Sequence, residues 1–292
     1  MRVLVTGWFS FLHGEITAGD ALALEAVSGA LDRTGICYDV AWSPVFRPEG
    51  LSLDDAIPDR YTHLVFVCGP VHGTQVNDLH VRYAGCRRIA VGVSVVDPAD
   101  PSVTGFDLVL ARDGGTGPPR RDLAAGPETS LVPVVGVILS SGQGEYGARR
   151  RHEEVSDRLT GWLGRRDCAR LGLDTRLDTT DWTRCATPAA FAAVVAKQDL
   201  VVTTRLHGLV LALRHGVPAL AVDPVAGGGK VTAQAVAWEW PAVVTAEESA
   251  HEQILDSWWK WCLSQEGGEA ARVRAGSRSS SLLKTLIQAL CH

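Results

Sequence analysis

Short apolar runs alternate with longer amphipathic segments along the first half of the chain. The apolar runs occupy positions 3–5, 64–67, 89–96 and 108–110, and the segment 21–31 has the apolar spacing of a helix. Continuous apolar runs separated by helical segments are typical of parallel strands that are covered on both faces. The pattern therefore predicts an α/β domain built on a parallel sheet.

A change of pattern follows the last of these runs. The segment 113–133 is rich in Gly and Pro and has no apolar period, which indicates a linker at the end of a domain. The alternation then restarts, which predicts a second βα unit. Its expected strands are 134–139, 200–202 and 219–222, and its expected helices are 153–163, 188–197 and 206–215.

Composition narrows the class of protein. Of the 292 residues, 46% are hydrophobic and 21% are charged, which is ordinary for a globular protein and excludes disordered, collagen-like and coiled-coil chains. The net charge of −5 gives no general positive excess for a nucleic acid or an anionic membrane, so neither partner is expected. No stretch reaches the roughly 18 to 20 apolar residues that cross a bilayer. The net charge is still compatible with an anionic ligand if Lys and Arg side chains cluster at one place.

Cysteine and histidine spacings carry no metal or disulfide motif. The seven cysteines are widely spaced, odd in number and without a C-x-x-C pair, so neither a disulfide framework nor a thiolate zinc site is predicted. His13, His63, His72 and His80 lack the i, i+4 spacing of a helical metal site. We therefore expect no metal, and a reducing cytoplasm as the compartment.

The most informative chemistry lies in the segment 199–222. A strand that ends near Thr204 delivers Arg205 and His207 to the loop and first turn of the next helix, where free N–H groups and the helix dipole favour an anion. Arg205 offers a planar fork for a carboxylate or phosphate, and His207 is suited to proton transfer. From the residues alone, an arginine that caps a neighbouring helix and a histidine that donates to a carbonyl fit equally well.

The run T-R-L-H-G, followed by an apolar helix, G-V-P, a strand and a downstream Lys-Val pair, resembles the hallmark segment of the polysaccharide pyruvyl transferase family. This resemblance implies that Arg205 and His207 belong to an active site, with Lys230 as the matching downstream lysine. Weaker likenesses are Gly19-Asp20 at a helix start, Cys68-Gly69-Pro70 after a strand, and Arg112-Asp113 at the end of the first domain.

The resemblance, together with the periodicity, implies two Rossmann-like α/β domains facing a central cleft, as in the GT-B architecture. We expect residues 1–130 to form the acceptor side, 131–265 the donor side, and 266–292 a helical tail that packs across the seam. Three tryptophans between 258 and 261 are expected to pack closing helices rather than to bind a ligand.

The activity implied by the resemblance is transfer of pyruvyl from phosphoenolpyruvate to a hydroxylated, sugar-type acceptor, forming a ketal. Phosphoenolpyruvate is then a co-substrate, and no cofactor is expected. His207 would act as general acid, and Arg205, Lys230, Ser141 and Gly208 would bind the donor.

The acceptor is expected to contact the first domain. Asp20 is a candidate for orienting or deprotonating an acceptor hydroxyl, and His72 and Gly69 are candidates for binding the acceptor. Two other functions stay open at this point: a nucleotide-sugar-dependent glycosyltransferase on the same fold, and a binding protein that kept the anion site without catalysis.

Two glycine-rich segments resemble nucleotide-binding motifs in part of their sequence. Residues 142–147 read G-x-G-x-x-G, but the acidic residue of a dinucleotide site is not clearly placed, so a flexible loop is expected. Residues 227–231 read G-G-G-K-V, with Pro224 in the place of the first glycine and Val231 in the place of the Mg²⁺-binding hydroxyl. We therefore predict neither a dinucleotide site nor a Walker site.

Overall fold

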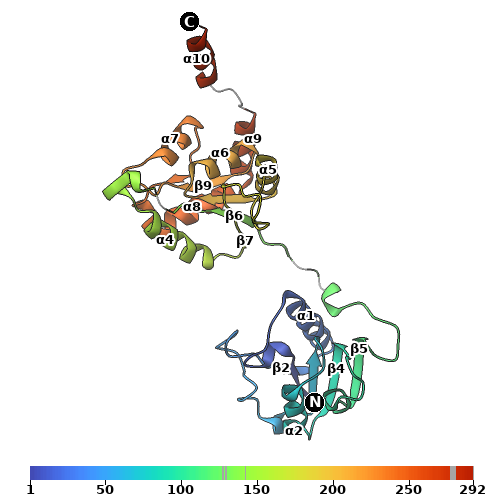
Figure 1. Cartoon of the computed structure of the whole chain (residues 1–292). Helices are drawn as coiled ribbons and strands as arrows, with labels where there is room; N and C mark the ends of the chain where they lie inside the picture. The colour runs from blue at the N-terminus through green and yellow to red at the C-terminus, as the bar shows by residue number, and fades with distance from the viewer. Residues whose placement is uncertain (127, 129, 142, 277–280, 292) are drawn as a thin grey trace. The chain divides into compact units, whose positions relative to one another are not determined.

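The chain forms two compact units, Met1–Thr129 and Ser130–His292, each built around its own parallel sheet (Figure 1). The computed structural model describes residues 1–126, 128, 130–141, 143–276 and 281–291. Two parallel α/β units confirm the fold class predicted from the sequence, and the central cleft of the GT-B arrangement stays a prediction. Among the described residues, no helix combines the length and apolar character that crossing a membrane requires.

Unit 1 has a five-stranded sheet in the order β2-β1-β3-β4-β5, with every neighbouring pair parallel. The strands are β1 Arg2–Thr6, β2 Cys37–Val40, β3 His63–Val67, β4 Arg87–Ser94 and β5 Leu108–Asp113. The four predicted apolar runs are all strands. The edge strand β2 has no continuous apolar run, which is why the pattern did not predict it. The helices are α1 Ala18–Arg33, α2 Thr74–Arg82 and α3 Pro101–Thr104, with 3-10 turns at Trp8–Ser10, Pro58–Arg60 and Leu123–Ala125.

Helix α1 begins three residues before the predicted segment 21–31 because Thr17 and Asp20 form a capping box. The Asp20 backbone N–H donates to Thr17 Oγ1 at 3.2 Å, and the Thr17 N–H donates to Asp20 Oδ2 at 2.9 Å. These bonds satisfy N–H groups that the first helical turn leaves without partners. The capping box therefore fixes where α1 starts at the carboxyl edge of the sheet.

Unit 2 has a second five-stranded parallel sheet in the order β10-β9-β8-β6-β7. Its strands are β6 Val134–Ile138, β7 Ala169–Gly172, β8 Leu200–Thr203, β9 Ala219–Val222 and β10 Val243–Val244. The pattern predicted β6, β8 and β9, which are strongly apolar. It did not predict β7, whose residues are all exposed, or β10, which has two residues.

The described residues of unit 2 form seven helices. They are α4 His152–Gly164, α5 Pro188–Val195, α6 Leu206–Arg214, α7 Lys230–Ala237, α8 Glu252–Cys262, α9 Gln265–Ala275 and α10 Ser281–Leu290, with 3-10 turns at Gly144–Arg149 and Glu248–Ala250. Every residue of β8 and β9 is buried, so these central strands form the middle of the core.

The C-terminal tryptophans are packing residues, as expected. Trp259 meets Trp162 edge-on at 5.4 Å between ring centroids, and Trp261 lies 5.3 Å from Trp240. Helix α9 packs against α6 of the same unit and buries Ala271. This part of the predicted tail therefore belongs to unit 2, and its packing across a seam stays a prediction. Residues 277–280 and 292 of that tail lie outside the described residues.

In each sheet, the side on which successive strands are added changes once, at a switch point. In unit 1 the chain runs from β1 to β2 on one side and then to β3 on the other, and in unit 2 it runs from β6 to β7 and then to β8. Ligands of open α/β sheets bind at the carboxyl ends of the strands beside such a point. The loops that follow β1 and β3, and those that follow β6 and β8, are therefore the places to examine.

Trp162 tests the core of unit 2. Its ring is 1% exposed, and its indole N–H donates to Asp256 Oδ1 at 2.8 Å. We expect Trp162→Ala to lower the free energy of unfolding by about 3–5 kcal/mol, since it leaves a large cavity. Denaturant unfolding followed by circular dichroism measures the change. Trp182→Ala is the control, because Trp182 is 93% exposed and its loss is expected to cost under about 0.5 kcal/mol. Equal effects of the two changes would contradict the packing described.

Candidate functional site

The turn between β8 and α6 is fixed by threonine hydroxyls. Thr203 Oγ1 donates to Ile138 O at 2.9 Å and accepts the Arg205 backbone N–H at 3.0 Å. Thr204 Oγ1 accepts the Ser140 backbone N–H at 2.8 Å, which ties the ends of β6 and β8 together. Thr203, Thr204 and Ser140 are buried, so these bonds satisfy polar groups that water does not reach. They set Arg205 as the N-cap of α6.

Arg205 reaches the loop that follows β7. Its Nη1 donates to Thr175 Oγ1 at 2.7 Å and to Asp174 Oδ1 at 3.1 Å. The Asp174 carboxyl also accepts hydrogen bonds from Arg176, and these donors, together with the charge of Arg205, hold its pKa below the usual range. Arg205 is therefore bound to an acidic loop and not to the end of a neighbouring helix, which was the alternative that the sequence left open.

His207 lies on the first turn of α6 and is exposed, unlike a core histidine bonded to a carbonyl. It lines a cavity of about 460 Å³ between α5 and α6. Thr175 lines the same cavity, so Arg205 is bonded to one residue of the wall to which His207 belongs. The remaining walls are mostly apolar and include Leu177, Pro188, Ala189, Phe191, Ala192 and Leu211, with Arg214 and His215 at the end of α6.

Gly208, expected at the donor site, is buried beneath α6. A Cβ at this position would lie 2.2 Å from Thr203 Oγ1, so only glycine lets α6 approach β8 this closely. Its side of the helix faces the sheet, and the arrangement gives Gly208 a packing role. Its part in donor binding stays a prediction.

Lys230 is the first residue of α7, and its Nζ lies 5.9 Å from the centre of the Tyr146 ring. The loop before it is organised by Asp223, a fully buried carboxylate that accepts the backbone N–H groups of Gly229 at 2.7 Å and Thr232 at 2.8 Å. Within the described part of the chain, no contact joins Lys230 to Arg205. The sequence analysis missed Asp223, although an acidic residue directly after a buried strand was visible.

The glycine-rich loop after β6 does not lead into a helix as a dinucleotide motif requires. A 3-10 turn spans Gly144–Arg149 with a kink at Gly147 (φ 50°, ψ −127°), and α4 starts only at His152. Ser141, expected at the donor site, is exposed on this loop. Gly142 lies outside the described residues.

Asp20 in unit 1 has both carboxylate oxygens engaged. Oδ2 accepts from the hydroxyl of Thr17 at 2.8 Å as well as from its backbone, and Oδ1 accepts from Cys68 Sγ at 2.6 Å. Burial and the neighbouring carboxylate together raise the pKa of the Cys68 thiol to about 12. The described contacts make Asp20 a capping residue, and its role toward an acceptor stays a prediction.

Gly69 and His72, the expected acceptor residues, lie against Trp8. Gly69 has φ +72°, and a Cβ there would lie 2.4 Å from the Trp8 ring. The Trp8 N–H donates to Pro70 O at 2.9 Å, and its ring lies 5.4 Å from that of His72. Trp8 therefore joins the loops after β1 and β3. An aromatic residue two positions after a strand was a signal in the sequence from which this role was not predicted.

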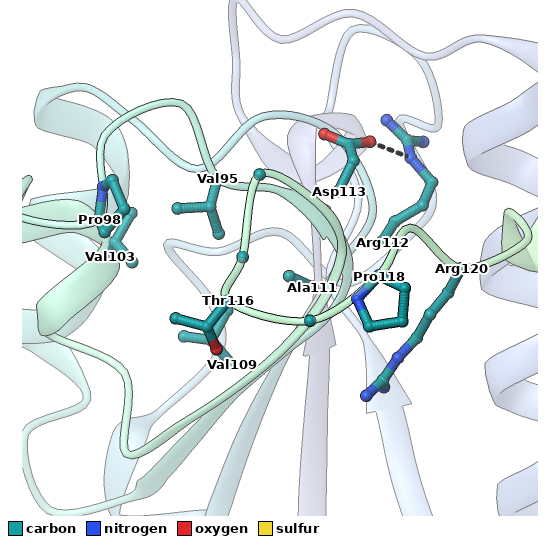
Figure 2. A pocket seen from close by; sticks show the side chains of 13 residues that line it. Val95, Pro98, Val103, Val109, Ala111, Arg112, Asp113, Thr116, Pro118 and Arg120 are labelled. Atoms are coloured by element: carbon teal, nitrogen blue, oxygen red, sulfur yellow. Dashed lines mark hydrogen bonds and ion pairs between the residues drawn. The ribbon is translucent and has the colours of Figure 1, made fainter.

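A second cavity, of about 370 Å³, lies at the carboxyl ends of β4 and β5 (Figure 2). Val95, Val109 and Ala111 line it on the strand side, and the loop 114–118 closes it. Figure 2 shows Arg112 paired with Asp113 among the residues that line the cavity. Arg112 Nε lies 2.8 Å from Asp113 Oδ2.

Arg112 also bonds Asp122 and donates to Ser94 Oγ at 2.6 Å. The Ser94 backbone N–H in turn donates to Gly69 O at 3.0 Å. The Arg112-Asp113 pair noted in the sequence therefore holds the cavity loop in place. Through Ser94, Arg112 also connects this loop to the loop after β3. No group of three or more His, Cys, Asp or Glu side chains placed to hold a metal ion occurs among the residues described.

The comparison with protein families supports the resemblance over one segment. Residues 168–224 match the family model of polysaccharide pyruvyl transferase. This span runs from the start of β7 to just beyond β9, and it contains Arg205, His207 and every residue that lines the cavity between α5 and α6. The predicted resemblance is confirmed for this segment. No curated protein matches the chain.

Solved structures with distant similarity include glycosyltransferases. The spinosyn rhamnosyltransferase SpnG in complex with thymidine diphosphate is 14% identical, over 94% of this chain and 95% of that one, with a TM-score of 0.34. The spinosyn forosaminyltransferase SpnP is 13% identical over 100% of both chains, with a TM-score of 0.35. UDP-GlcNAc 2-epimerase from Methanocaldococcus jannaschii, in complex with UDP-GlcNAc and UDP, is 10% identical over 99% of this chain and 100% of that one, with a TM-score of 0.34.

The Cys68–Asp20 pair predicts slow thiol chemistry. With a pKa of about 12, only about one Cys68 in 10⁴ is a thiolate at pH 8, and the thiolate is the reactive form. We expect iodoacetamide at pH 8 to alkylate the exposed Cys37 while Cys68 stays unmodified, as peptide mass spectrometry would show. Burial is the largest cause of this raised pKa, and the Asp20 carboxylate is the next. Asp20→Asn removes the second cause, so labelling of Cys68 is expected to become faster. Labelling of Cys68 as fast as that of Cys37 in the unaltered protein would contradict the pair.

Proposed function

We propose that the protein transfers the pyruvyl group of phosphoenolpyruvate to a hydroxylated, sugar-type acceptor. The observation that carries the proposal is the segment 168–224, which matches the pyruvyl transferase family. In this segment His207 lines a cavity, and Arg205 bonds Thr175 in the wall of the same cavity. The donor is a co-substrate, and no further cofactor enters the proposal.

Arg205 is suited to hold the donor. Phosphoenolpyruvate carries a carboxylate and a phosphate, and a guanidinium binds either of them with two parallel hydrogen bonds. Thr175 and Asp174 engage Nη1, while Nε and Nη2 contact no partner within the described residues. The first N–H groups of α6 add donors at the same place, because no helical partner exists for them.

His207 is suited to supply the proton that the reaction needs. Protonation of the methylene carbon of phosphoenolpyruvate creates the methyl group, and an acceptor hydroxyl then bonds to the central carbon. A second hydroxyl bonds to the same carbon as phosphate leaves, which gives the ketal and inorganic phosphate. The two hydroxyls lose two protons, one of which restores His207 while the other leaves with the phosphate.

Arg205→Lys tests the donor site. An ammonium keeps the charge but cannot reproduce the planar fork, so the affinity for phosphoenolpyruvate is expected to fall about tenfold or more while stability changes little. Titration calorimetry gives the affinity. Arg165→Lys, at an exposed position on the same unit, is the matched control, and UDP- and GDP-sugars are expected to produce no binding heat. Unchanged binding in Arg205→Lys would remove Arg205 from the site, and binding of a nucleotide sugar alone would replace the proposed donor.

His207→Gln tests the acid. Because a general acid acts on the chemical step, this variant is expected to retain donor affinity while turnover falls roughly 10²- to 10⁴-fold. Phosphate release at saturating phosphoenolpyruvate measures turnover, and circular dichroism verifies folding. His251→Gln, at an exposed position before α8, serves as the control and is expected to keep full turnover. A folded His207→Gln protein with unaltered turnover would leave only an anion-binding pocket.

A further inference from the structure

Three guanidinium groups converge on the single carboxylate of Asp174, beside the cavity that His207 lines. Asp174 Oδ2 lies 2.6 Å from Arg176 Nη2 and 4.0 Å from Arg184 Nη1, and Oδ1 lies 3.1 Å from Arg205 Nη1. All three arginines belong to the segment that matches the family model. Only Arg205 was singled out by the sequence pattern.

The contacts of Asp174 differ in strength. Its Oδ2 accepts from both Nε (2.8 Å) and Nη2 (2.6 Å) of Arg176, whereas Arg205 makes one longer bond to Oδ1. Arg205 is held more closely by Thr175, at 2.7 Å, so it keeps its orientation if the carboxylate moves away. Thr175 therefore still anchors Arg205 when another anion takes the place of Asp174.

The neighbouring carboxylates do not compete for Arg205. Asp178 accepts the backbone N–H groups of Thr180 and Asp181, and the Oδ1 of Asp181 accepts the N–H of Thr183. Asp181 also pairs with Arg184 through its other oxygen, at 3.2 Å. These carboxylates hold their own turns, which leaves Asp174 as the one acid that reaches Arg205 among the described residues.

We propose that Arg176 and Arg184 bind the donor anion together with Arg205, and that Asp174 occupies this anion position until the phosphate of the donor replaces it. The inference rests on the proposed function for the identity of the donor. A phosphate carries more charge than a carboxylate and offers more acceptor oxygens, so it displaces Asp174 where singly charged ions do not. Arg176 and Arg184 are then donor-binding residues that no motif revealed.

The decisive variant is Asp174→Asn. Asparagine keeps the side-chain oxygen that accepts the Arg176 backbone N–H at 3.0 Å, so the turn is retained while the competing charge is lost. We expect this variant to bind phosphoenolpyruvate and inorganic phosphate about two- to fivefold more tightly, as for removal of a partly exposed ion pair that competes with the ligand. If Asp174 only orients Arg205, the same change weakens binding.

Arg184→Gln is the second test variant. Arg184 does not contact Arg205, so the change leaves the bonds of Arg205 in place. It is expected to weaken binding of both anions about threefold to tenfold. Asp157→Asn and Arg165→Gln, both at exposed positions on α4 or at its end, are the matched controls and are expected to change neither affinity. Calorimetric affinities are compared for proteins whose folding circular dichroism has verified.

Binding of phosphoenolpyruvate and of inorganic phosphate, measured side by side, distinguishes failure of the proposed donor from failure of the role given to Asp174. Tighter binding of inorganic phosphate by Asp174→Asn without any binding of phosphoenolpyruvate would keep the anion site and overturn the proposed donor. Weaker or unchanged binding of both anions by Asp174→Asn, or no binding of either anion by any of the proteins, would overturn the role given to Asp174. Unchanged binding in Arg184→Gln would remove Arg184 from the site.

Discussion

The hydroxyl groups at the ends of β6 and β8 determine where unit 2 places Arg205 and His207. A central strand buried on both faces ends with polar backbone groups that water does not reach, and these groups need partners inside the protein. Thr203 and Thr204 supply them, at Ile138 O and at the Ser140 N–H. Because Thr203 also accepts the Arg205 N–H, the same bonds start α6 and turn Arg205 toward the β7 loop. The packing of Gly208 against Thr203 then fixes the helix that carries His207.

The sequence predicted the parts of this arrangement that depend on local pattern. Strands β6, β8 and β9 have apolar runs, and the boundaries of α6 follow from the end of β8 and from Gly216. Strands β2 and β7 lie at sheet edges and contain charged residues, so no apolar run marked them. Their pairing is decided by the neighbouring strand and not by their own composition.

Long-range partners were outside the reach of the sequence. Arg205 was a candidate on its own motif, but its bonds to Asp174 and Thr175 join residues about 30 positions apart. The cavity at His207 arises from the approach of α5 to α6, and nothing in the sequence of α5 alone predicts its volume. Trp8 was missed for a related reason, because its role comes from loops that only the folded sheet brings together. Asp223 is different, because the groups that it bonds follow it closely in the chain, at Val225, Gly229 and Thr232.

The candidate groups differ in how much of their bonding capacity the protein itself uses. Asp20 accepts from Thr17 and Cys68 through both oxygens, and Asp223 is saturated by the loop and helix that it holds. A carboxylate that is fully bonded stabilises its fold but has little left for a substrate. Among the described residues, Arg205 uses one of its three guanidinium nitrogens for bonding, and His207 lines a cavity. Compared with Asp20 and Asp223, Arg205 and His207 therefore keep more bonding capacity for a ligand, and both lie within the segment that matches the family model.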